Sequence, residues 1–87
     1  MMADPKKINR LLRTARGQLD GILKMVEEDR YCVDIVNQVM AAQSLLGSAA
    51  REILRAHIDH CVREAFEQGK EKEKIDEIVT LLDQFTR

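Results

Sequence analysis

Two cysteines and one histidine are the residues whose types and spacing could perform chemistry in this chain. Cys32, His57 and Cys61 supply two thiolates and one imidazole, and His57 and Cys61 stand four residues apart, on one face of a helix. This set suits a soft metal ion. Three ligands are enough for Cu(I), whereas Zn(II) would need a fourth, which His60 could supply. The alternatives are thiol chemistry between the cysteines, or ordinary packing on an apolar face.

One long helix carries all three residues. From Val33 to Gln68 there is no proline and only one glycine, Gly47, and apolar residues recur at alternating steps of four and three along two neighbouring lines. The first line is Ile35, Val39, Ala42, Leu46, Ala49, Ile53 and Ala56. The second is Val36, Met40, Gln43, Gly47, Ala50, Leu54, His57 and Cys61. One partner helix needs only one line, so we expect one line to pack inside the chain and the other against a second copy.

The length of this helix keeps the candidate ligands apart. At 1.5 Å per residue, Cys32 lies about 37 Å from His57 and about 43 Å from Cys61, so one chain cannot bring them to one ion or one disulfide. Two copies packed antiparallel would bring them together if the helices cross near residues 45 and 46. Small residues gather there: Ala41, Ala42, Gly47, Ser48, Ala49 and Ala50. The spacing therefore predicts two identical sites per dimer, each with Cys32 from one chain and His57 and Cys61 from the other.

Two shorter helices complete a single all-α domain over residues 1–87. Asp4 and Pro5 predict the start of a first helix that runs to about Glu28, with an apolar seam of Ile8, Leu12, Ala15, Leu19, Ile22 and Val26. A turn at residues 29–31 leads into the long helix, which should end near Gln68 with Gly69 as its cap. A charged connection over residues 70–74 precedes a third helix, whose predicted buried side is Ile75, Ile78, Val79, Leu82 and Phe85.

Composition narrows the functional classes. The chain has 87 residues and only two cysteines, too few for a disulfide scaffold, which favours a reducing cytosol and reactive or metal-binding thiols. The polar start lacks the apolar core of a signal peptide, and no apolar run approaches membrane-spanning length. There is no glycine-rich phosphate loop and no nucleophile motif, so we do not expect an enzyme.

Binding to DNA would have to rest on local basic clusters, because the net charge is −1. The candidates are Lys6, Arg10, Arg13 and Arg16 on the first helix, joined by Arg51 and Arg55 on the long helix if the two helices lie side by side. No helix-turn-helix or zinc-finger signature is present, and an ordinary solvated face is the alternative.

Three stretches of the chain resemble the copper-sensitive operon repressor (CsoR) family: residues 16–22 (RGQLDGI), residues 28–35 (EDRYCVDI) and the His57-x-x-x-Cys61 pair. The similarity covers almost the whole chain. It implies a three-helix protomer, an antiparallel four-helix-bundle dimer and a dimer of dimers. It also implies a Cu(I) site between chains, with Tyr31 and Glu77 supporting the ligands, and a repressor that releases operator DNA when Cu(I) binds.

Related branches define the alternatives. Persulfide-sensing members resemble this chain in both cysteines but lack the histidine, so a thiol-sensing repressor of the same fold is the second interpretation. A copper-buffering protein that does not bind DNA is the third. Nickel- and cobalt-responsive members look to use a histidine near the N-terminus, and this chain has none before His57. Two residues depart from the family pattern on the DNA surface: Leu11 stands where an arginine is expected, and Ser48 where many members are basic.

Overall fold

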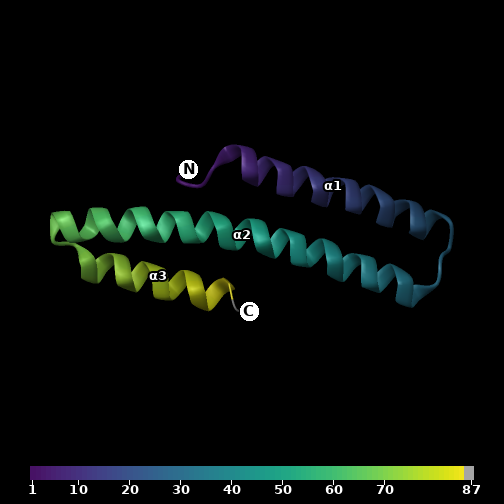
Figure 1. Cartoon of the computed structure of the whole chain (residues 1–87). Coiled ribbons are helices and arrows are strands. Elements are labelled where there is room, and N and C mark those ends of the chain that lie inside the picture. The colour runs from purple at the N-terminus through teal and green to yellow at the C-terminus, as the bar shows by residue number, and fades with distance from the viewer. Residues whose placement is uncertain (86–87) are drawn as a thin grey trace.

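The chain folds into consecutive α-helices joined by short turns. Figure 1 shows the computed structural model, which describes residues 1–85. Within these residues the elements are α1 (Pro5–Glu27), α2 (Cys32–Gln68) and α3 (Glu71–Phe85), with no strand. Both shorter helices run antiparallel to α2, α1 beside its first half and α3 beside its second. The predicted all-α class with a three-helix protomer is therefore confirmed. Residues 1–85 contain no helix that could span a membrane.

The predicted helix boundaries at the two turns agree with the local chemistry. The Asp4 side chain accepts a hydrogen bond from the Lys6 backbone N–H at 3.1 Å, and Pro5 occupies the first helical position. Asp29 adopts a φ of 52° in the turn before α2. At the other end of α2, Gly69 has a φ of 70°, and its N–H donates to the Ala65 carbonyl. Each helix end is thus set by a residue suited to that backbone position.

The predicted charged connection over residues 70–74 is wrong. Helix α3 begins at Glu71, directly after Lys70, and Glu71 and Glu73 lie in its first turn. Carboxylates are favourable there because they face the positive end of the helix dipole. The earlier start places Lys74 and Glu77 three residues apart on one helix, close enough to interact.

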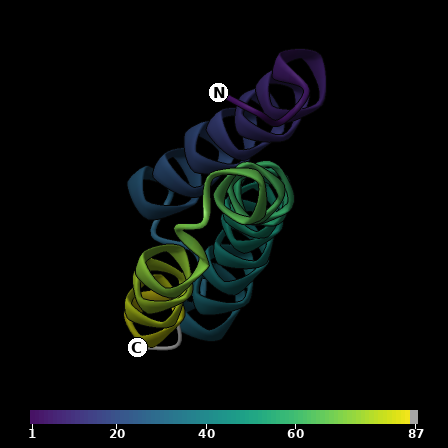
Figure 2. The same ribbon diagram turned by 90° about the vertical axis from the view of Figure 1, so that its left-hand side faces the viewer.

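The protomer is thin. Its Cα atoms extend 57 × 27 × 12 Å, and the shortest dimension is close to the diameter of one helix. Figure 2, a view along the helices, shows α1 and α3 flanking α2 without a second layer above them. The buried residues of the described part are mostly small: Ala3, Ile8, Ala15, Ile22, Ala42, Ala49 and Ala65. Stable domains bury an apolar face between two layers of secondary structure, and this protomer has only one layer.

Part of the predicted apolar pattern packs within the chain. Ala42 and Ala49, from the first line of α2, are buried beside α1, as expected. The second line begins with Val36 and Met40, which are exposed. In α1 the predicted seam divides: every second member is buried, and the others are exposed, namely Leu12, Leu19 and Val26. A large apolar surface therefore remains uncovered in the single protomer.

The predicted buried side of α3 is wrong in the protomer. Ile75, Val79 and Leu82 are exposed, and only Ile78 of that set is half-buried among the described side chains. The side chain of Phe85 lies outside the described residues. The half-buried positions of α3 are instead Glu71, Lys74, Ile78 and Leu81, a seam rotated from the predicted one. The rotation brings Lys74 toward α2.

The left-handed backbone at Gly69 generates a stability prediction. Replacing Gly69 by alanine should lower the free energy of unfolding by about 1 kcal/mol, because an L side chain is strained at this φ. Asparagine tolerates the conformation better, so Gly69→Asn should lose less. Urea unfolding of the three proteins at one fixed protein concentration measures the difference. An alanine variant as stable as the wild type would contradict the assigned cap.

Candidate metal centre and basic surface

His57 and Cys61 form one half of the predicted metal site. One helical turn separates them, and the Cys61 Sγ lies 3.4 Å from Nε2 and 3.7 Å from Nδ1 of His57. Cys61 is a free thiol, and both residues are half-buried. The soft sulfur and the imidazole are therefore already in contact before any ion arrives, and the helix fixes their spacing. This donor pair fits a soft metal ion.

Two residues of α3 lie against this pair. Oε1 of Glu77 is 3.7 Å from Nε2 of His57, and Nζ of Lys74 donates a hydrogen bond to Oε2 of Glu77 at 3.3 Å. The hydrogen bond to Glu77 raises the pKa of Lys74, and the negative charges of Glu77 and Cys61 add to the effect. Glu77 thus lies beside His57, where the family resemblance placed it. Sequence reasoning missed Lys74 because it assigned that residue to a connection.

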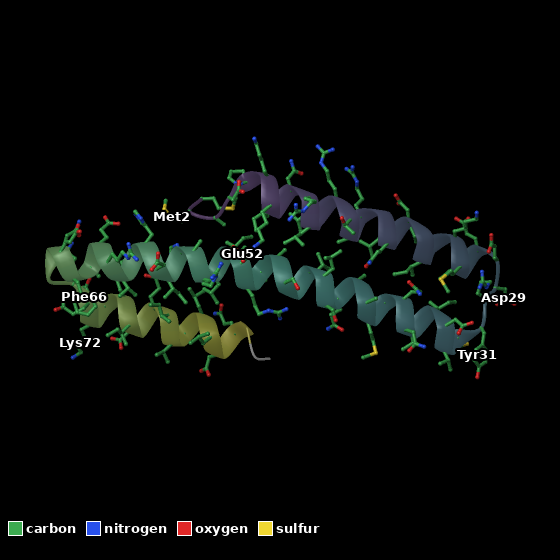
Figure 3. The ribbon with its side chains drawn as sticks, viewed as in Figure 1. Met2, Asp29, Tyr31, Glu52, Phe66 and Lys72 are labelled. Atoms are coloured by element: carbon green, nitrogen blue, oxygen red, sulfur yellow. The ribbon has the colours of Figure 1, made fainter. Side chains whose placement is uncertain are left out.

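The other half of the predicted site lies at the opposite end of α2. Cys32 is the first residue of the helix and is exposed, and Tyr31, just before it, is 68% exposed. Figure 3 shows Tyr31 at one end of the molecule and Phe66 at the other. Because α2 is unbroken, Cys32 and His57 remain about 37 Å apart. Among the described residues, no three histidine, cysteine or acidic side chains of one chain could hold a metal ion.

His60, the candidate fourth ligand, has another partner in the structure. Its Nε2 lies 3.4 Å from Oε2 of Glu64, one turn further along α2, and both side chains are about half exposed. His57 is instead paired with Cys61 and Glu77. The structure does not bring His60 into that group.

The basic residues of α1 gather on one exposed surface. Lys6, Arg10 and Arg13 line a shallow hollow with Asn9 and Thr14. A neighbouring hollow includes Arg13 and Arg16. The Arg13 Nε donates to the Asn9 side-chain oxygen at 2.9 Å, so this guanidinium is held along the helix. These four charges form the basic surface of α1.

The two arginines of α2 are placed differently. Arg51 and Arg55 line an apolar hollow with Ile58 and with Leu82 of α3, so they do not join the hollow on α1. Arg51 donates to the Ser48 hydroxyl at 3.2 Å, and a Cβ on Gly47 would lie 3.3 Å from the Arg51 guanidinium. The guanidinium of Arg51 therefore folds back along α2 and rests beside residue 48.

A carboxylate links the two helices near these arginines. Glu52 accepts a hydrogen bond from Arg55 at 3.1 Å and forms an ion pair with Lys7 of α1 at 3.3 Å. Figure 3 shows Glu52 on the side of α2 that faces the start of α1. The hydrogen bond from Arg55, followed by that from Lys7, lowers the pKa of Glu52. Leu11, the departure noted on α1, is half-buried.

Comparison with known proteins shows the family. The family described as metal-sensitive transcriptional repressor matches residues 4–84, and the chain belongs to it. Membership confirms the predicted family and the prediction of a regulator rather than an enzyme.

Individual relatives agree with this assignment. The copper-sensing transcriptional repressor CsoR of Mycobacterium ulcerans is 44% identical over 80 residues, which cover 90% of this chain and 68% of that protein. The structure of the copper-sensing repressor CsoR with Cu(I) from Geobacillus thermodenitrificans superimposes with a TM-score of 0.85, at 34% identity over 94% of this chain and 85% of the other. The structure of the nickel-responsive transcriptional regulator InrS superimposes with a TM-score of 0.86. Its sequence identity is 29%, and the match covers 98% of this chain and 96% of the other.

The lowered pKa of Glu52 predicts how stability should depend on pH. A carboxyl whose pKa is lower in the folded protein adds stability above its unfolded pKa, and this stability is lost as pH falls through the folded pKa. Glu52→Gln should therefore be less stable than the wild type at pH 7, and the two should converge only below the folded pKa of Glu52, which lies under the ordinary value of 4.5. Urea unfolding of both proteins at pH 7 and at a pH below the folded pKa measures this difference in the free energy of unfolding. A difference that persists in acid would assign the loss to packing rather than charge.

Proposed function

We propose that this protein is a Cu(I)-responsive transcriptional repressor, whose apo form binds operator DNA and releases it when Cu(I) binds between two chains. The observation that carries the proposal is the preformed His57–Cys61 pair on the same unbroken helix as Cys32. The family supplies the regulatory class, since its members are metal-sensitive transcriptional repressors. Relatives described as copper-sensing supply the expected ion.

The donor set favours Cu(I) over other metals. The fold alone does not select a metal, because a copper-sensing and a nickel-responsive regulator superimpose on the chain equally well. Two thiolates and one imidazole complete a three-coordinate Cu(I) site, whereas a closed Zn(II) site needs a fourth ligand. His60, which could provide it, lies against Glu64 instead.

A second copy of the chain would complete both the site and the core. The thin protomer leaves apolar side chains exposed on all three helices, and an antiparallel partner would cover part of them. The same arrangement would bring the partner's end of α2, with its cysteine and tyrosine, to His57 and Cys61. We propose this antiparallel four-helix dimer as the unit that binds metal, and a dimer of dimers as the complete repressor.

Release of DNA would follow from differential binding. If Cu(I) binds one shape of the oligomer more tightly than the shape that fits DNA, the metal shifts the population away from DNA. The basic surface of α1, from Lys6 to Arg16, would contact phosphates in the apo form. A reducing cytosol would keep both cysteines available as thiols.

The thiol-sensing alternative uses the same cysteines in a different reaction. In that interpretation Cys32 and Cys61 of two chains would form a disulfide or polysulfide bridge, and His57 would have no chemical part. The approach of Glu77 to Nε2 of His57 supports the metal interpretation, because a metal-bound histidine usually donates the N–H of its other ring nitrogen to a carboxylate. The remaining nitrogen, Nδ1, lies 3.7 Å from the Cys61 sulfur.

Titration of the apo protein against its own upstream DNA, at several salt concentrations and then with Cu(I), tests the proposal. Binding should weaken steeply with salt, and Cu(I) should release the DNA. Arg13→Ala/Arg16→Ala should weaken apo binding and reduce the salt slope by about one unit per lost phosphate contact, while Cu(I) affinity stays near that of the wild type.

Two controls sharpen this experiment. Lys24→Ala/Arg30→Ala also removes two positive charges, but from residues paired with Glu28 beyond the basic surface, and it should change DNA binding little. His57→Ala should bind DNA but lose the response to Cu(I). A wild-type protein that binds Cu(I) tightly yet binds no upstream fragment specifically would favour copper buffering and contradict the repressor.

A further inference from the structure

The first turns of α3 bring a lysine to the proposed copper site. Lys74 lies on the half-buried seam of α3, facing α2, although it is charged, and its side chain is 38% exposed compared with 75% for Lys24. Its ammonium donates to one oxygen of Glu77 at 3.3 Å, and the other oxygen of the same carboxylate is 3.7 Å from Nε2 of His57. The carboxylate thus lies between the ammonium and the imidazole.

We propose that Lys74 is a positioning residue of this site: it holds the Glu77 carboxylate against His57 and places a positive charge beside that carboxylate. This inference rests on the proposed Cu(I) function. It assigns a task to a residue of α3 that supplies no ligand. The raised pKa of Lys74 agrees with it, because the hydrogen bond to Glu77 is the largest cause of that shift.

The geometry explains what the lysine would do for the imidazole. A carboxylate that accepts a hydrogen bond from Nε2–H fixes the ring tautomer and leaves Nδ1 free to bind an ion. Oε1 of Glu77 lies 3.7 Å from Nε2, just beyond hydrogen-bond distance, and the Cys61 sulfur lies 3.7 Å from Nδ1 and 3.4 Å from Nε2. Glu77 is exposed on a helix surface and can rotate away unless a second contact holds it. The i,i+3 hydrogen bond from Lys74 provides that contact.

Charge gives the lysine a second effect. Cu(I) bound by two thiolates carries a net negative charge, and the Glu77 carboxylate beside it adds another. A nearby ammonium lowers the electrostatic free energy of this cluster, to a degree limited by its contact with solvent.

An ordinary surface ion pair is the competing explanation for Lys74. The chain has other such pairs along its helices, including Arg63 with Asp59 and Lys24 with Glu28. Exposed pairs of this kind contribute little to stability. The Lys74–Glu77 pair differs because its carboxylate also approaches a candidate metal ligand, His57. The two explanations therefore predict different effects on metal binding.

Three variants of the full-length protein separate them. Lys74→Gln removes the charge and the strong donor, Lys74→Arg keeps both, and Lys72→Gln is the matched control. Lys72 is exposed on the same turn of α3, and Figure 3 shows it pointing outward. Cu(I) affinity is measured by competition with a chromophoric Cu(I) chelator. NMR of the His57 ring nitrogens in the apo protein reports which nitrogen carries the proton.

We expect Lys74→Gln to bind Cu(I) about tenfold more weakly, at the lower end of the effect of residues that orient metal ligands. Its apo His57 ring should show a mixture of tautomers where the wild type shows the Nε2–H form. Lys74→Arg should restore both readouts, and Lys72→Gln should match the wild type. If Lys74 had only a structural role, replacing it would leave the tautomer of the His57 ring unchanged.

Two results would overturn the inference in different ways. If Lys74→Gln matches Lys72→Gln in Cu(I) affinity and in tautomer, Lys74 is a surface ion pair, and the proposed function is unaffected. If the wild-type protein itself does not bind Cu(I) tightly, the proposed function fails and the role of Lys74 fails with it.

Discussion

The unbroken course of α2 is the constraint on which the rest of this structure depends. A helix that continues from Cys32 to Gln68 cannot fold back, so its two thiols stay about 43 Å apart. Any ion that needs both must be shared between two chains. The contact between His57 and Cys61 makes such sharing chemically reasonable, because two of the three predicted ligands already lie together in each protomer.

The same helix also explains why the protomer is thin. Each shorter helix covers only one half of α2, and the shortest dimension stays at 12 Å. Apolar residues such as Val36, Met40 and Val79 therefore remain exposed. In our proposal a second, antiparallel copy of the chain would cover the exposed apolar surface. The same copy would supply the cysteine that the metal site lacks. Metal binding would then act directly on the geometry of an interface, which is where a change can reach DNA-binding surfaces on both chains.

The sequence predicted the helices well because their signals are local. Asp4, Pro5 and Gly69 mark ends through backbone preferences, and the three-four periodicity identifies α1 and α2. The start of α3 was missed because residues 70–74 alternate lysine and glutamate, which is also typical of a charged loop. Glu71 and Glu73 were therefore not recognised as acidic residues of a first helical turn. The buried side of α3 was wrong because its apolar residues fall on more than one face of the helix, and the sequence pattern alone does not say which face packs against α2.

The candidate site was predictable only in part. His57 and Cys61 meet because a helix places residues four apart on one face, which spacing alone reveals. The approach of Glu77 to His57 depends on how α3 packs against α2, so only the family resemblance suggested it. For Lys74, neither residue spacing nor the family resemblance indicated a place at the site. Its proposed role depends on the earlier start of α3, which the sequence analysis misplaced, and on how α3 is rotated against α2, which is set by tertiary packing.

The most direct test of the shared site is complementation between two defective chains. A Cys32→Ala chain and a His57→Ala/Cys61→Ala chain are mixed under exchange conditions, and heterodimers are verified by native mass spectrometry. Neither parent should bind Cu(I) tightly, whereas each heterodimer should regain one complete site, about one ion per four chains at random exchange. A verified mixture that binds no Cu(I) tightly, or a Cys32→Ala parent that binds as well as the wild type, would contradict the shared site.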